Sequence, residues 1–256
     1  MVLTIVTVVY NGEAEIENTI LSVIPVKNEN VEYIIIDGNS KDGTSAIIDK
    51  YKTHIDFFLT EDDKGIYDAM NKAIKYARGK YIYILNVGDL LLGKTFKTLF
   101  EENLFDGRYD VLYGDVINKQ TGILIKSKEI NEIKYLLPVC HQGIIVKKEL
   151  YDKFLFLTKY DIAADYDMLF KSYNYGASFY KINYPLAQYD MQGISTKNST
   201  HVYKQYYRII FNNNKGLNKI LGVLLYTGLH IKRYTYVMVN FILGEAFYRK
   251  LRSFFK

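Results

Sequence analysis

The sequence predicts an α/β protein, with a mostly parallel β-sheet flanked by helices and a C-terminal helical appendage. Apolar, β-branched runs alternate with amphipathic stretches, several runs end at Asn-Gly or Asp-Gly steps, and the balance of charge changes sign near residue 200. Strands that alternate with helical stretches of about 10–15 residues are typical of βαβ units and a parallel sheet.

The first strand is predicted over residues 1–10, a continuous apolar run that stops at Asn11-Gly12. This run has no basic segment and no small-residue cleavage site, so it does not indicate a signal peptide. The alternation then continues with a helix over 13–23, a strand over 31–36, a helix over 44–51 with Thr44 as N-cap, a strand over 55–59, a helix over 66–77 and a strand over 81–85.

Beyond Asp89 the pattern is less regular. We expect a hairpin of residues 111–117 and 123–128 joined near Thr121-Gly122, and then strands over 143–146 and 179–182 with a helix over 166–175 between them. No internal repeat and no Pro/Gly/Ser-rich linker interrupts this part. Residues 1–200 are therefore predicted to form one domain, and residues 201–256 a helical tail.

Composition excludes several classes of protein. Of the 256 residues 49% are hydrophobic and 24% charged, which argues against disorder. The single cysteine excludes a disulfide framework and a cysteine-based zinc site, and it fits a reducing compartment such as the cytoplasm.

The charge is divided unevenly along the chain. Residues 201–256 hold ten basic residues and one acid, Glu245, for a charge of +9, whereas residues 1–200 carry −4. The uncharged runs 220–231 and 234–244 are too short to span a bilayer. With basic edges and many aromatic residues they favour attachment to a membrane surface, although packing on the main domain or on a second subunit would also suit them. Nucleic-acid binding is disfavoured, since the tail lacks a recognised motif and the rest is acidic.

Acidic residues follow three of the four predicted parallel strands. In open α/β sheets ligands bind outside the carboxyl ends of the strands, where this sequence places Asp37, Glu61-Asp62-Asp63 and Asn86-Val87-Gly88-Asp89. Neither Gly-x-Gly-x-x-Gly nor a Walker-type loop is present, which disfavours dehydrogenases and P-loop NTPases. Carboxylates at this edge can accept hydrogen bonds from hydroxyl groups of a ligand. They can also bind a hard divalent cation whose other ligands are phosphate oxygens. Taken alone, residues 86–89 would be an ordinary turn.

Four segments occur in order and together resemble the family-2 glycosyltransferases, which are inverting enzymes of the GT-A fold. They are Thr7-Val8-Val9-Tyr10-Asn11, Asp37-Gly38-Asn39-Ser40-Lys41-Asp42-Gly43-Thr44, Gly65-Ile66-Tyr67-Asp68-Ala69-Met70-Asn71 and Leu85-Asn86-Val87-Gly88-Asp89. The resemblance covers about residues 3–200 and is nearest to bacterial enzymes of capsule, O-antigen and exopolysaccharide assembly. It implies a GT-A type Rossmann-like sheet.

The resemblance also implies roles for residues of the first half. Asp89 would match the last acid of the family's Asp-x-Asp motif and bind Mg²⁺ or Mn²⁺, whereas Asn86 and Gly88 replace the other acids, so strict metal dependence is in question. Asn86 would contact diphosphate or acceptor. The residues expected at the nucleotide and donor sugar are Thr7, Tyr10, Asn11, Asp37, Asp68 and Asn71.

In the second half the resemblance points to Asp165 as the general base. Asp165 and Asp167 lie at a predicted helix start, where carboxylates also act as caps. His141, in the step Cys140-His141-Gln142, would lie near the diphosphate or acceptor, although a lone histidine is more often structural. Ser195, in a Gly-Ile-Ser turn, is expected to touch phosphates. The family's Gln-x-x-Arg-Trp motif is absent, because the sequence has no Trp, and this disfavours processive synthases.

The predicted reaction is transfer of one sugar from a nucleotide-diphosphate sugar, with UDP expected, to an acceptor hydroxyl. The tail suggests a lipid-linked saccharide acceptor and a peripheral position on the inner face of the cytoplasmic membrane. Two other functions stay open: a sugar nucleotidyltransferase, which would be expected to show a Gly-rich basic loop near the N-terminus, and a non-catalytic, membrane-attached nucleotide-sugar-binding protein.

Overall fold

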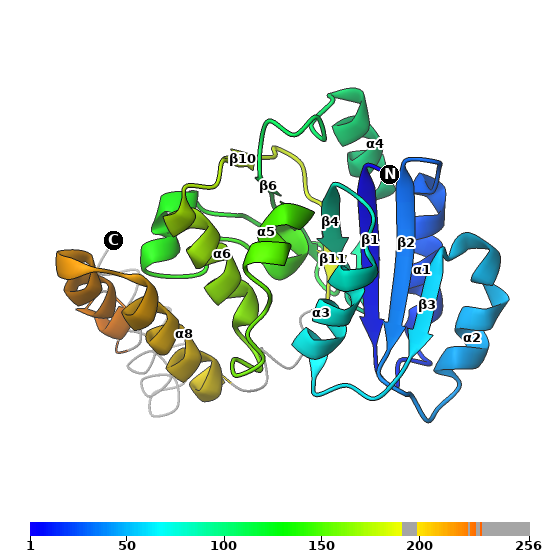
Figure 1. The fold of residues 1–256 in the computed structure, drawn as a ribbon, viewed down its shortest axis with the longest axis horizontal. Helices are drawn as coiled ribbons and strands as arrows, with labels where there is room; N and C mark the ends of the chain where they lie inside the picture. Colours follow the sequence, from blue (N-terminus) through cyan, green and yellow to red (C-terminus); the bar gives the residue numbers. More distant parts are fainter. Residues whose placement is uncertain (191–198, 225, 229–230, 232–256) are drawn as a thin grey trace.

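A seven-stranded sheet forms the centre of the protein in a computed structural model that describes residues 1–190, 199–224, 226–228 and 231 (Figure 1). The strand order is β10-β6-β9-β4-β1-β2-β3. β1 to β4 run parallel to one another, and β9 runs antiparallel to β4 and β6. The predicted mostly parallel sheet is confirmed. Its strands are β1 (Leu3–Val9), β2 (Val31–Asp37), β3 (Phe57–Thr60), β4 (Tyr81–Ile84), β6 (Val111–Tyr113), β9 (Ile144–Lys147) and β10 (Phe179–Lys181).

Helices cover both faces of this sheet, which explains why its central strands are almost wholly apolar. Along β1, Val6 and Val8 enter one core, whereas Leu3, Ile5 and Val9 enter the other. The first core is completed by α3 (Ile66–Tyr76), α5 (Lys148–Lys153) and α6 (Ala164–Tyr175). The second is completed by α1 (Ile16–Val23), α2 (Thr44–Lys50) and α4 (Gly93–Glu101).

The predicted strand over 111–117 is instead two strands in two sheets. After β6 the chain turns at Gly114, where a Cβ would lie 2.9 Å from the carbonyl oxygen of Tyr184, and the Asp115 carboxylate holds the turn by accepting the Ser127 N–H at 2.8 Å. The single-strand prediction was wrong for this reason, although the pairing across Thr121-Gly122 is confirmed. The second sheet consists of β5 (Leu90–Leu91), β11 (Ala187–Tyr189), β7 (Val116–Asn118) and β8 (Leu124–Ile125).

Helix starts differ from the predictions at two places. Thr44 is the first residue of α2 and not its N-cap, because the Asp42 carboxylate accepts the Thr44 N–H at 3.1 Å, and the Thr44 hydroxyl accepts the Gly12 N–H at 2.9 Å instead. The helix predicted from residue 166 begins at Ala164, so Asp165 lies within its first turn. The short helices α4 and α5 were not predicted.

The C-terminal part begins with α8 (Ser199–Asn213), which packs against α6 (Figure 1). Residues 216–224 are helical as well. The predicted boundary after residue 200 falls inside α8, and the division into a domain and a tail stays a prediction. The run 234–244 lies outside the described residues. Among the residues that are described, no helix is long and apolar enough to cross a membrane.

Candidate functional site

The turns after β1 and β2 interlock at the carboxyl edge of the sheet. The Asp37 carboxylate is fully buried and accepts the Ser40 N–H at 3.1 Å. Asn11 has a positive φ of 49°; its N–H donates to the Ser40 hydroxyl oxygen at 2.7 Å, and its side-chain oxygen accepts the Lys41 N–H at 2.8 Å. Tyr10 stands beside them with 62% of its surface exposed. The structure thus brings Tyr10, Asn11 and Asp37 together.

The other residues predicted to meet the donor lie in different surroundings. Thr7 is fully buried inside the sheet, where its hydroxyl lies 3.0 Å from that of Tyr33. Asp68 accepts the Lys64 N–H at 3.0 Å at the start of α3. The Asn71 amide is used entirely by the backbone of Phe156, with a donated bond of 2.8 Å and an accepted bond of 3.0 Å. Asn71 therefore holds the segment that leads towards α6.

Asp89 is a buried carboxyl group on the turn after β4. Only 3% of the residue is exposed, and its two oxygens accept the Gln142 amide N–H at 2.6 Å and the Asp190 backbone N–H at 2.8 Å. Burial raises the pKa of Asp89 to about 7, although these two hydrogen bonds oppose the rise. The group is therefore divided between its charged and neutral forms near neutral pH.

Two buried polar atoms beside Asp89 have no hydrogen-bond partner within the described structure: Oδ1 of Asn86 and Nε2 of His141. Asn86 lies on the same turn as Asp89, whose N–H donates to the Asn86 carbonyl at 3.2 Å. Unpartnered buried polar atoms are uncommon in folded proteins and often mark a place where a ligand or water binds.

Asp165 lies in the first turn of α6 and is 7% exposed. One carboxylate oxygen accepts the Tyr166 N–H at 2.8 Å and lies 3.1 Å from the Tyr67 hydroxyl. Burial, and then the charge of Asp165, raise the pKa of Tyr67 well above its usual value, so this hydroxyl remains a donor. The other carboxylate oxygen of Asp165 lies 3.4 Å from Nδ1 of His141.

A single turn of 3₁₀-helix, His141–Gly143, joins the two acidic groups. His141 reaches Asp165 and Gln142 reaches Asp89, while the Tyr83 hydroxyl donates to the Gln142 carbonyl at 2.8 Å and fixes the turn. The two carboxyl groups are thus positioned relative to each other by adjacent side chains. Sequence reasoning singled out His141, but it gave no role to Tyr67, which occurs in a segment that carries the resemblance, or to Gln142, which follows His141 directly.

The residues present fit a divalent cation in a limited way. In the described part of the chain no three His, Cys, Asp or Glu side chains group as metal ligands. Asp89 and the free Oδ1 of Asn86 supply two oxygen ligands of the kind that Mg²⁺ and Mn²⁺ prefer. A cation here would therefore need phosphate and water oxygens to complete its coordination.

The other residues that the sequence singled out have structural roles or lie outside the described residues. Asp167 accepts a bond from Asn213 at 3.1 Å and pairs with Lys171 at 2.6 Å, which ties α6 to α8. Burial raises the pKa of the Cys140 thiol to about 12, so it stays protonated. Ser195 lies outside the described residues.

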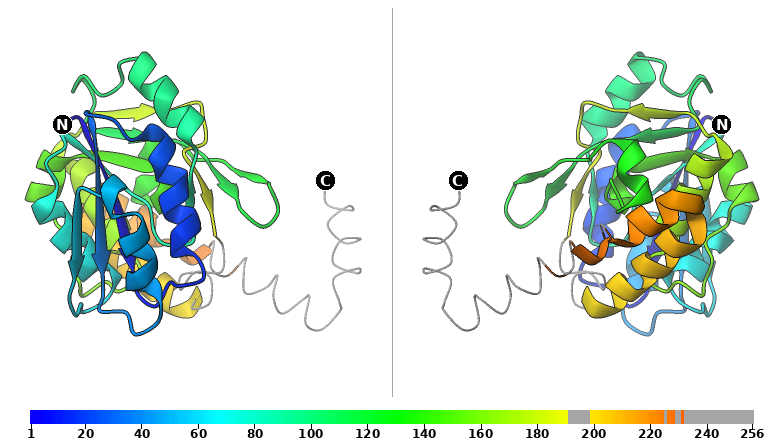
Figure 2. Two further views of the ribbon diagram at one scale, coloured as in Figure 1. Left: turned by 90° about the vertical axis from the view of Figure 1, so that its right-hand side faces the viewer. Right: turned by 90° about the vertical axis from the view of Figure 1, so that its left-hand side faces the viewer.

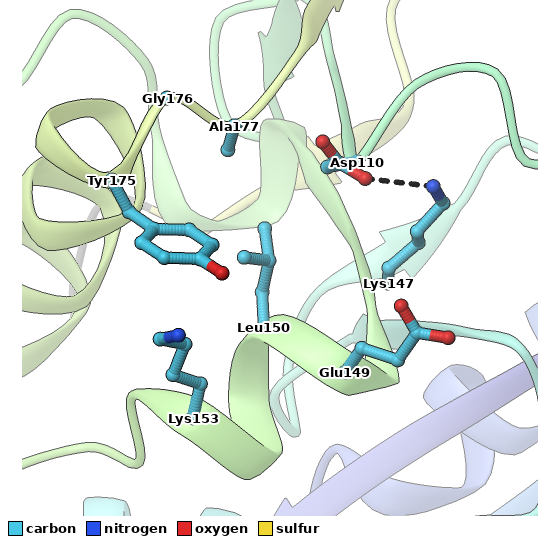
Figure 3. Close-up of a pocket in the computed structure, with 8 residues that line it drawn as sticks. All are labelled: Asp110, Lys147, Glu149, Leu150, Lys153, Tyr175, Gly176 and Ala177. Atoms are coloured by element: carbon cyan, nitrogen blue, oxygen red, sulfur yellow. Dashed lines mark hydrogen bonds and ion pairs between the residues drawn. The ribbon is translucent and has the colours of Figure 1, made fainter.

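A cavity of about 170 Å³ lies at the opposite edge of the sheet (Figure 3). It is bordered by the ion pair of Lys147 and Asp110, at 2.7 Å, and by Tyr175. Lys147 pairs with Tyr81 at the first residue of β4, whereas Asp89 follows the last. This cavity is therefore separate from the acidic cluster.

Comparison with known proteins places this arrangement in a family. The family model described as glycosyl transferase family 2 matches residues 4–175. The chain belongs to this family. The match includes the turns after β1, β2 and β4, the His141 turn and α6, which confirms the resemblance stated from the sequence.

Relatives and solved structures agree with the family. A PGL/p-HBAD biosynthesis glycosyltransferase of Mycobacterium tuberculosis is 28% identical over 144 residues, which are 53% of this chain and 56% of that protein's length. The fold resembles Staphylococcus aureus TarS 1–349 in complex with UDP-GlcNAc, with a TM-score of 0.70 and 17% identity. The match covers 88% of this chain and 70% of the TarS chain. It also resembles the mannosyltransferase PcManGT of Pyrobaculum calidifontis in complex with GDP-Man and Mn²⁺, with a TM-score of 0.66 and 18% identity. That match covers 88% of this chain and 68% of the PcManGT chain. The predicted GT-A fold is confirmed.

Proposed function

We propose that this chain transfers one sugar from a nucleotide-diphosphate sugar to an acceptor hydroxyl, with inversion at the anomeric carbon. One observation carries the proposal: the single turn His141–Gly143 positions two buried carboxyl groups, Asp89 and Asp165, at the carboxyl edge of the sheet. Family membership supports sugar transfer over nucleotidyl transfer. UDP is the proposed nucleotide, supported by the bound UDP-GlcNAc of TarS, and the GDP-Man of PcManGT makes GDP the next candidate.

Asp165 is proposed as the general base. Its carboxylate would take the proton of the acceptor hydroxyl while that oxygen attacks C1 of the sugar, and the bond from C1 to the diphosphate oxygen breaks on the opposite side. Tyr67 and the Tyr166 N–H hold the carboxylate. One of its oxygens is then left to face His141 and the acceptor.

The donor diphosphate is proposed to lie between Asp89 and His141. Asp89 and Asn86 would hold Mg²⁺ or Mn²⁺, which neutralises charge on the departing diphosphate. The unpartnered Nε2 of His141 can donate to a phosphate oxygen while Nδ1 faces Asp165. Asn11 would contact the base or ribose from the turn after β1, with Tyr10 beside it, and the buried Asp37 would support that contact by holding Ser40 in place.

The acceptor is proposed to be a lipid-linked saccharide, reached from the inner face of the cytoplasmic membrane. The support is the charge of +9 over residues 201–256, because anionic lipid attracts basic segments by about 1 kcal/mol per residue near the surface. Assembly into a homo-oligomer remains a further proposal.

A donor panel tests the function directly. The full chain is incubated with UDP-, GDP- and dTDP-sugars and Mn²⁺ or Mg²⁺, with donor hydrolysis and transfer followed by release of nucleotide. We expect one nucleotide class to turn over, and the anomeric configuration of the product, read by NMR, to be opposite to that of the donor. Calorimetric binding of a donor without hydrolysis or transfer would instead favour the non-catalytic alternative.

A further inference from the structure

Two exposed stripes on the C-terminal helices make up one surface, which we call the C-terminal face. Each stripe follows the i, i+3, i+4, i+7 spacing of one side of a helix. On α8 the stripe contains Lys204, Tyr207, Arg208 and Phe211, all of them exposed. On the helix over 216–224 it is wholly aliphatic and consists of Leu217, Ile220, Leu221 and Leu224, which are 70%, 59%, 39% and 61% exposed.

The aliphatic stripe faces outwards because the other side of its helix is anchored. A Cβ at Gly222 would lie 2.9 Å from Cγ2 of Ile210, so the helix backbone lies directly on α8. Tyr226 is buried, and its hydroxyl donates to the Tyr203 carbonyl at 3.0 Å. The Lys219 ammonium lies 3.6 Å from the centre of the Phe211 ring and joins the two stripes.

The charge of the C-terminal face is of one sign. Residues 201–231 contain Lys204, Arg208, Lys215 and Lys219 and no Asp or Glu. Helices that expose aliphatic and aromatic side chains and whose own charged side chains are all basic are typical of helices that lie in a lipid interface. A symmetric contact with a second copy would set the same positive charges against each other, which disfavours it.

We propose that the C-terminal face docks on an anionic lipid bilayer. Leu217, Ile220 and Leu224 would enter the boundary between headgroups and acyl chains, while Lys204 and Arg208 meet the lipid phosphates. α8 lies at the end of the molecule opposite α2 (Figures 1 and 2).

The same helix is tied to the segment that precedes the proposed base. His201 lies 2.8 Å from the Asp161 carboxylate, and Gln205 contacts both Asp161 and the Ile162 N–H. Asp161 also borders a small cavity of about 20 Å³ together with Tyr67. Docking would thus bring the bilayer to the side of the site from which Asp165 would meet a lipid-linked acceptor. This last step rests on the proposed function, whereas docking itself does not.

Sedimentation with vesicles tests the proposal without any assay of activity. The full chain is mixed with vesicles of phosphatidylcholine alone or with phosphatidylglycerol added, and the bound fraction is measured. We expect at least tenfold stronger partitioning to the anionic vesicles. The triple variant Leu217→Ser, Ile220→Ser, Leu224→Ser should lose at least tenfold, because its aliphatic stripe can no longer enter the lipid.

A charge variant separates docking from any effect of the triple variant on folding. Lys204→Gln with Arg208→Gln should weaken binding to anionic vesicles by about fivefold per residue. Lys94→Gln with Lys97→Gln on α4 removes the same charge from another exposed surface and should leave binding unchanged.

Three results would overturn the proposal. The first is equal binding of the wild type to both kinds of vesicle. The second is undiminished vesicle binding by both the triple variant and the Lys204, Arg208 double variant. The third is a wild type that is dimeric and a triple variant that is monomeric by light scattering, while neither binds vesicles. Absence of sugar transfer with intact vesicle binding would count against the proposed function alone.

Discussion

Replacing Asp89 with asparagine should remove a pH dependence from the stability of the fold. The folded-state pKa of Asp89 is raised from 3.8 to about 7 by burial, whereas in the unfolded chain it returns to about 3.9. The folded protein therefore binds this proton more tightly than the unfolded chain does. Its contribution to stability is fully present below about pH 4 and is lost as the pH rises through about 7.

The size of this effect follows from the shift. A rise of about three pKa units corresponds to about 4 kcal/mol, which is a large fraction of the roughly 5–15 kcal/mol that stabilises a typical domain. The amide that Asp89→Asn introduces does not titrate. It can keep one of the two accepted hydrogen bonds and would lose or rearrange the other, at a pH-independent cost of about 1 kcal/mol.

Urea unfolding followed by far-UV circular dichroism, without divalent metal, measures the difference. Between about pH 5 and 8.5 the free energy of unfolding of the wild type should fall relative to that of Asp89→Asn by about 3 kcal/mol, and the rest of the difference lies below pH 5. Asp110→Asn is the matched control: hydrogen bonds and the charge of Lys147 outweigh burial and lower the Asp110 pKa, so its contribution changes only in acid. Parallel curves for wild type and Asp89→Asn would refute the reasoning.

Three further predictions concern the same site. Asn71→Ala breaks both hydrogen bonds to the Phe156 backbone and should lower the free energy of unfolding by about 1–3 kcal/mol in urea titrations. An unchanged free energy of unfolding would mean that water replaces these two hydrogen bonds. Gln142→Ala removes the amide that orients Asp89 and should weaken Mn²⁺ binding about 10- to 100-fold. The weakening is measured as a higher Mn²⁺ concentration for half-maximal donor turnover. An unchanged concentration would mean that Gln142 has no effect on metal binding. Thermal stabilisation by Mn²⁺ with UDP should grow as the pH rises from about 6 to 8, because the cation requires the ionised Asp89; stabilisation independent of pH would place the cation elsewhere.

The sequence predicted those parts of the fold whose surroundings can be recognised from the residues of a single strand or helix. β1, β2 and β4 are buried on both faces, so their continuous apolar runs were recognisable. The rule that ligands meet carboxyl ends drew attention to Asp37 and Asp89, and the structure has Asp37 at the end of β2 and Asp89 on the turn after β4. By contrast, the strands of the second sheet, such as Leu90–Leu91, have two or three residues. A segment of that length shows no period of two, and only pairing with distant strands makes it a strand.

The missing parts of the site depend on contacts between distant positions. Gln142 meets Asp89 across 53 residues and Tyr67 meets Asp165 across 98. No local pattern encodes these contacts, because they arise when β9 returns beside β4 and α6 packs near α3. Thr7 shows a related limit: the family resemblance implied a place in the nucleotide pocket, yet its hydroxyl lies beside that of Tyr33 inside the sheet.

The central claim is that Asp165 removes the acceptor proton, and turnover of Asp165→Asn tests it most directly. With the donor identified by the panel, kcat and calorimetric donor affinity are measured for wild type and variant. We predict a loss of about 10²–10⁴-fold in kcat with donor affinity kept within a few-fold. Full turnover in Asp165→Asn, with intact folding and donor binding, would contradict the account.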